Sequence, residues 1–84
     1  MIRGVCGSLE SNDCLIIVEE NDKLEIIIES IVFKFYGEQI KRVIEETLTK
    51  LNITKIKVFC NDKGALDYTI KARLIEAINR MGYK

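Results

Sequence analysis

The spacing of apolar residues changes once along the chain, from a period of two to a helical period. Three short apolar stretches come first, over residues 2–7, 14–18 and 24–29. In the third of these, Leu24, Ile26 and Ile28 alternate with glutamates. Alternation of this kind predicts β-strands with one covered face. Short polar segments separate the stretches, so we expect strands joined by tight turns.

The helical period begins after the third stretch. The expected buried stripe of a first helix is Phe33, Tyr36, Ile40, Val43, Ile44, Thr47, Leu48 and Leu51, at spacings of three and four. Gly37 lies within this stripe and predicts that the helix begins near it. A strand over residues 56–60 follows, and then a second helix. The expected buried stripe of that helix is Leu66, Ile70, Leu74, Ala77, Ile78 and Met81, and Gly82 should end it.

This order of elements defines the expected fold class. The sequence β-β-β-α-β-α predicts an α+β two-layer domain, in which two helices cover one face of a sheet of about four strands. The chain has 84 residues, of which 48% are hydrophobic. These values fit one small folded domain, residues 1–84, with a modest core.

The turn after the first strand contains the most informative residues. It reads Gly7-Ser8-Leu9-Glu10-Ser11-Asn12-Asp13. Short polar side chains of this kind favour a tight turn because they hydrogen-bond the nearby backbone. A serine hydroxyl at an exposed hairpin tip is accessible to a modifying enzyme, which is what covalent attachment of a cofactor requires. The spacing of the residues in this turn does not show whether Ser8 or Ser11 would be the attachment residue.

A second polar segment precedes the last helix. It reads Asn61-Asp62-Lys63-Gly64-Ala65-Leu66-Asp67 and is followed by Lys71-Ala72-Arg73-Leu74. We expect Asp62 to cap the helix and Asp67 to complement its dipole, while Gly64 permits a tight turn. The alternative is functional, with Lys63 and Asp67 forming part of a docking surface. The role of Glu10 in the first turn is equally open.

The sequence offers few of the residue patterns that catalysis requires. There is no histidine, so the commonest general base and metal ligand is absent. The three cysteines Cys6, Cys14 and Cys60 have no CxxC spacing, and we expect them to be buried as small hydrophobic residues. We therefore predict no catalytic residue, no metal site and no enzymatic activity. A substrate-bearing or interaction role fits the chain better.

Charge is distributed unevenly, although 13 basic and 13 acidic residues balance. Residues 10–29 contain seven acidic residues and one basic residue, whereas residues 51–84 contain seven basic and three acidic residues. An acidic turn region argues against nucleic-acid binding at that end. The uneven field either steers partners or is an ordinary solvated surface. No apolar run approaches the roughly 20 residues of a membrane span, so we expect a cytoplasmic protein with no membrane partner.

Both polar segments, in this order and at this separation, resemble the citrate lyase acyl carrier protein (gamma chain) family. The resemblance implies that Ser11 carries triphosphoribosyl-dephospho-coenzyme A through a phosphodiester bond. It also implies that the thiol of this group holds acetyl and citryl thioesters. The implied partners are the acyl transferase and citryl lyase subunits, a transferase that attaches the group, and a ligase that acetylates its thiol. Citrate is then cleaved to oxaloacetate and acetate.

Other functions stay open at this point. A carrier for the related citramalate lyase would have the same features, because a carrier touches substrate only through its arm. A malonate decarboxylase carrier is disfavoured, since the segment from Asp62 to Asp67 resembles the citrate lyase branch. A different class is an unmodified α+β interaction module whose basic C-terminal half binds a protein or RNA. This alternative predicts that Ser11 is unmodified and that partner binding persists in the Ser11→Ala variant.

Overall fold

The computed structural model describes residues 2–82. Its elements in chain order are β1 (Arg3–Gly7), β2 (Cys14–Glu20), β3 (Glu25–Ser30), α1 (Phe33–Lys50), β4 (Ile56–Asp62) and α2 (Asp67–Arg80). The predicted order of strands and helices is confirmed. The strands β2 and β4 each extend two residues beyond the predicted end, and Gly82 follows α2 with a φ of 76°, as expected for the residue that ends a helix.

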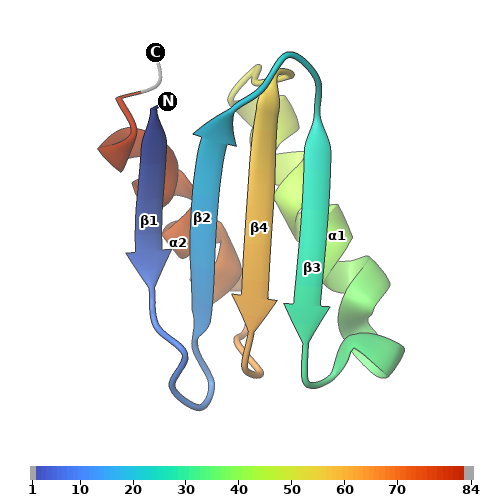
Figure 1. Cartoon of the computed structure of the whole chain (residues 1–84). Coiled ribbons are helices and arrows are strands. Elements are labelled where there is room, and N and C mark those ends of the chain that lie inside the picture. The colour runs from blue at the N-terminus through green and yellow to red at the C-terminus, as the bar shows by residue number, and fades with distance from the viewer. Residues whose placement is uncertain (1, 83–84) are drawn as a thin grey trace.

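The four strands form one mixed sheet in the order β1-β2-β4-β3. The pairs β1–β2 and β2–β4 are antiparallel, whereas β3 and β4 are parallel and are connected through α1. Between β2 and β3 the chain passes over the end of β4 (Figure 1). Both helices lie on one face of the sheet, which confirms the α+β two-layer architecture (Figure 1).

This topology brings distant segments to one end of the molecule. The β1–β2 turn lies at the lower edge of the sheet in Figure 1, where β3 and β4 also end. The loops that lead into α1 and α2 begin at the same edge (Figure 1). As a result, the two polar segments of the sequence lie on the same side of the domain.

The core lies between the helices and the covered face of the sheet. Along β2 and β4 every second side chain is buried, and Val18 is paired directly with Val58 across the two strands. From α2, Leu74 and Ile70 are fully buried against this face. Burial of such side chains contributes most of the folding free energy, at about 1.5–3 kcal/mol each. The predicted stripe of α2 is confirmed except for Leu66, which is exposed.

The predicted start of the first helix was wrong. The helix α1 begins at Phe33, and Gly37 lies within it as a buried residue. A side chain at position 37 would place its Cβ 2.7 Å from the ring of Phe33, so glycine leaves room for this ring. The predicted stripe is buried only in its middle part, from Ile40 to Leu48, with Val43 partly buried. Phe33, Tyr36 and Leu51 are exposed, at 54%, 53% and 43%. The first turns of α1 therefore present aromatic surface at the end that holds the β1–β2 turn.

No helix within residues 2–82 combines the length and the apolar character needed to cross a membrane.

Candidate functional site

The β1–β2 turn presents Ser11 to solvent. Ser11 and Asn12 are both exposed at the tip of the turn. Asn12 has a positive φ of 66°, a conformation that asparagine tolerates better than most residues. The backbone N–H of Asp13 donates to the carbonyl of Glu10 at 3.2 Å and closes the turn. The tip is therefore a defined turn with its serine on the outside.

Asp13 holds this turn in place through both carboxylate oxygens. Its Oδ2 accepts from Ser8 Oγ at 2.7 Å and from Arg73 Nη2 at 3.2 Å. Its Oδ1 accepts from the backbone N–H of Cys14 at 2.7 Å and from Arg73 Nε at 3.1 Å. The hydrogen bond from Ser8, then that from Arg73, lowers the pKa of Asp13 below its usual value. Asp13 thus connects the turn to α2.

The two serines of the turn have different environments. Ser8 is half-buried, and its hydroxyl donates to Asp13 and accepts from the backbone N–H of Glu10 at 3.3 Å. Ser11 is exposed, and its Oγ makes no hydrogen bond to the rest of residues 2–82. The hydroxyl of Ser8 is therefore used in the turn itself, whereas that of Ser11 is accessible for reaction.

The second polar segment lies directly against the turn. The backbone N–H of Asn12 donates to the carbonyl of Lys63 at 2.8 Å, and the N–H of Lys63 donates to the carbonyl of Asp13 at 2.9 Å. Gly64 has a φ of 92°, which glycine adopts without strain, and its Cβ position would lie 3.7 Å from Asn12 Oδ1. The two segments that carry the family resemblance therefore form one continuous surface.

The predicted capping role of Asp62 was wrong. Helix α2 begins at Asp67, and its N-cap residue Leu66 makes no side-chain capping bond. Asp62 is instead the last residue of β4, where its buried carboxylate accepts from the N–H groups of Gly64 and Ala65 at 3.2 and 2.9 Å. It organises the loop before the helix. The expected position of Asp67 in the first turn of α2 is confirmed.

Ser30 and Gln39 were missed by the sequence analysis. Ser30 Oγ donates to Asp62 Oδ2 at 2.8 Å across the parallel pair β3–β4. Gln39 Nε2 donates to both carboxylate oxygens of Asp67, at 3.0 and 2.9 Å, and so joins α1 to α2. No local sequence pattern predicts either contact, because the partners are separated by 32 and 28 positions.

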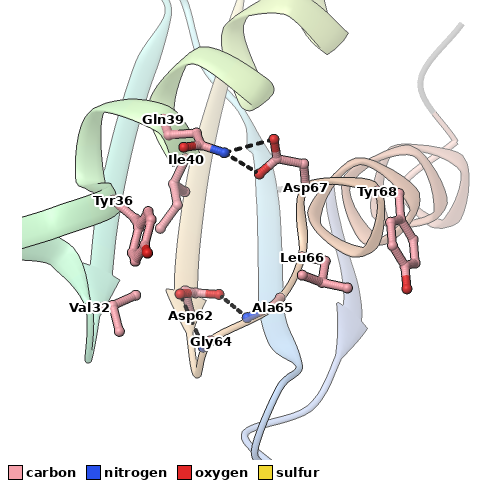
Figure 2. A pocket seen from close by; sticks show the side chains of 10 residues that line it. All are labelled: Val32, Tyr36, Gln39, Ile40, Asp62, Gly64, Ala65, Leu66, Asp67 and Tyr68. Carbon is pink, nitrogen blue, oxygen red and sulfur yellow. Dashed lines mark hydrogen bonds between the residues drawn. The ribbon is translucent and has the colours of Figure 1, made fainter.

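A pocket of about 550 Å³ opens between the first turns of α1 and the loop from β4 to α2. The residues that line it are Val32, Tyr36, Gln39, Ile40, Asp62, Gly64, Ala65, Leu66, Asp67 and Tyr68. In Figure 2, Tyr36 and Ile40 lie on one side, Ala65 and Leu66 on the other, and the Gln39–Asp67 hydrogen bonds close one edge. Gly64 belongs to this lining and directly follows Lys63, whose carbonyl accepts from the N–H of Asn12 in the turn.

The cysteines lie in the core, as predicted. All three are buried and none is in a disulfide. Hydrogen bonding to Cys14 and burial both raise the pKa of the Cys60 thiol. A thiol in that state is a poor nucleophile. Among residues 2–82 no group of three potential ligands could hold a metal ion.

We expect Asp13→Asn to destabilise the protein by about 1 kcal/mol at pH 6, because it removes the charge that Arg73 and Ser8 bind at a partly solvated site. The pKa of Asp13 is lowered in the fold, so its contribution is present above the unfolded value and disappears as the pH falls through the folded value. Urea unfolding at pH 6 and pH 3 should therefore show a difference at pH 6 that shrinks at pH 3. The control variant Asp22→Asn, at an exposed position, should not change the free energy of unfolding at either pH. An equal loss of stability in Asp13→Asn at pH 6 and pH 3 would contradict the role of the Asp13 charge.

Comparison with known proteins gives the class of this domain. A family model described as the malonate decarboxylase delta subunit (MdcD), an acyl carrier protein model, matches residues 2–81. A chain in the crystal structure of a Pseudomonas malonate decarboxylase hetero-tetramer in complex with malonate has the same fold, with a TM-score of 0.83. The match covers 95% of this chain and 84% of that chain at 18% identity. The domain is therefore of the acyl carrier protein class that this family model describes.

Individual relatives identify the family more narrowly than the family model does. The citrate lyase acyl carrier protein of Treponema denticola is 45% identical over 80 residues, which cover 95% of this chain and 92% of the relative. That of Streptococcus mutans is 49% identical over 78 residues, which cover 90% of this chain and 76% of the relative. The chain therefore belongs to the citrate lyase acyl carrier protein family.

Proposed function

We propose that this chain is the acyl carrier subunit of a citrate lyase, a single domain of residues 1–84, and that Ser11 is its attachment residue. The observation that supports this most strongly is the contrast between the two turn serines. Ser8 is bound to Asp13, whereas Ser11 is exposed on a turn fixed by hydrogen bonds to a second loop. An enzyme that modifies the chain can reach the Ser11 hydroxyl without unfolding the turn.

The group we assign to Ser11 is donated by triphosphoribosyl-dephospho-coenzyme A and keeps one of its three chain phosphates as the link. For a phosphodiester to form, Ser11 Oγ must bond to the phosphorus nearest the ribose while its proton passes to a base of the attaching transferase. The bond from that phosphorus to the remaining diphosphate breaks, and diphosphate leaves. The exposed Oγ allows this approach, and the hydrogen bonds of Asn12 and Asp13 hold the backbone of the turn in place.

The group supplies a thiol that activates a carboxylic acid as a thioester, and this chain supplies its position. We assign catalysis to the partner subunits, an acyl transferase and a citryl lyase. A short tether keeps the acyl group at an effective concentration of the order of millimolar for both active sites. The other proposed partners are the attaching transferase and the ligase that acetylates the thiol, all in the cytoplasm.

The substrate is tested by combining the modified chain with the two catalytic subunits. We expect citrate to give oxaloacetate and acetate only when the modified chain is present, measured by the release of oxaloacetate. Citramalate is the matched alternative, and its cleavage would release pyruvate. Pyruvate release from citramalate without oxaloacetate release from citrate would contradict the citrate assignment, and equal rates with unmodified chain would contradict the carrier role.

A further inference from the structure

The pocket between α1 and the β4–α2 loop lies next to the attachment turn. The N–H of Asn12, directly after Ser11, donates to the carbonyl of Lys63 at 2.8 Å, and the next residue, Gly64, lines the pocket. Adding standard bond lengths to this hydrogen bond places the Cα atoms of Ser11 and Gly64 within about 10 Å of each other. A group attached to Ser11 is therefore anchored close to the pocket, within the length of a phosphoribosyl linker.

The lining of the pocket has two apolar walls and one polar edge. Tyr36 and Ile40 form one wall, and Leu66 faces them from the other side (Figure 2). The polar edge is the hydrogen-bonded pair of Gln39 and Asp67. Apolar surfaces on two sides with hydrogen-bonding groups along one edge match a flat heterocycle, whose faces are apolar and whose rim is polar.

The charges of the lining disfavour binding of the negatively charged parts of the prosthetic group. The lining contains two carboxylates, Asp62 and Asp67, and neither lysine nor arginine. A phosphate or a citryl group would meet negative charge there without a compensating cation, which is unfavourable. A neutral group is preferred, and the volume of about 550 Å³ exceeds what a single nucleobase needs.

We propose that this pocket binds the adenine base of the prosthetic group, an inference that rests on the proposed function of Ser11. Coenzyme A has its thiol at one end and adenosine at the other, and the added phosphoribosyl unit that joins the serine is on the adenosine side. Adenine is therefore the flat neutral heterocycle of the group, and it is on the side attached to Ser11. Glutamine amides pair with the donor and acceptor atoms of the adenine edge, and bases stack on aromatic side chains such as Tyr36.

Binding of the base would change the motion of the arm. The adenosine end is held at the domain surface, and only the pantetheine end moves between the partner active sites. A weak site is sufficient, because a base tethered at millimolar effective concentration occupies a site with a dissociation constant of about 1 mM roughly half of the time. The pocket thus shortens the moving tether without trapping the acyl group.

The test is a titration of adenosine into isotope-labelled Ser11→Ala protein, followed by NMR of backbone and side-chain amides. This variant cannot be modified at position 11, so the pocket is tested independently of attachment. We expect saturable shifts at Gly64, Leu66 and the Gln39 side-chain amide. Adding Tyr36→Ala should weaken binding by about tenfold, as expected for the loss of one stacking wall.

Two controls make the outcome specific. Phe35→Ala removes the neighbouring aromatic, which is more exposed than Tyr36 and does not line the pocket, and it should leave adenosine binding unchanged. Inosine, which lacks the amino group of adenine, should bind more weakly. The inference is overturned if adenosine causes no saturable shifts at the pocket, if Tyr36→Ala binds as well as its parent, or if pantetheine alone produces these shifts. A Ser11 adduct without adenosine binding would reject the pocket assignment and retain the carrier role. Adenosine binding in a protein whose native Ser11 is unmodified would reject the carrier role and leave the pocket as an adenosine site.

Discussion

We expect Ser11→Ala to carry no prosthetic group and to support no lyase activity, while unfolding at nearly the same urea concentration as the parent. The hydroxyl is the only group removed, and Ser11 is exposed, so the stability change should stay within about 0.5 kcal/mol. Intact mass spectrometry after incubation with the attaching transferase measures the first effect. Denaturant unfolding measures the second.

The matched control for this change is Ser8→Ala. It lies in the same turn, but its hydroxyl bonds to Asp13, so we expect a moderate loss of stability and retained attachment at Ser11. An adduct on Ser11→Ala, or full lyase activity of that variant, would show that the attachment residue is elsewhere. Loss of the adduct only in Ser8→Ala would assign attachment to Ser8 instead.

Leu74→Ala should have the opposite effects. Leu74 is fully buried between α2 and the sheet, and its truncation opens a cavity that costs about 2–5 kcal/mol. For a domain of this size, such a loss is a large share of the total free energy of unfolding. Urea unfolding should show a lower midpoint. The fraction that remains folded should still accept the prosthetic group, because the Ser11 turn is unchanged.

Leu24→Ala is the control for this second prediction. Leu24 is 44% exposed, so the same truncation should cost much less than at Leu74. Equal losses at the two positions would contradict the placement of Leu74 in the core. Loss of attachment in folded Leu74→Ala would contradict the separation of core and site.

The element order was predictable because each element has its own period of apolar residues. The alternation in β3 and the three-and-four spacing around Ile40 and Ile44 are local signals of this kind. The strand order was not predictable, since nothing in the sequence indicates that β4 lies between β2 and β3. The start of α1 was misjudged because Gly37 accommodates a ring one turn earlier instead of beginning the helix.

The candidate site was predictable only in its local part. The polar turn around Ser11 is visible in the sequence, and so is the polar segment that ends in Asp67. Their association depends on the bonds from Asn12 to Lys63 and from Arg73 to Asp13, which join residues 51 and 60 positions apart. No sequence pattern encodes such contacts. The pocket likewise exists only once α1 and the loop before α2 come together.

The most direct test of the central claim is peptide mass spectrometry on the protein purified with its active lyase from the native host. We predict a coenzyme-A-like adduct, joined through a phosphodiester, on the peptide that contains Ser11. An unmodified Ser11 in that active material would contradict the account and would favour an unmodified interaction module.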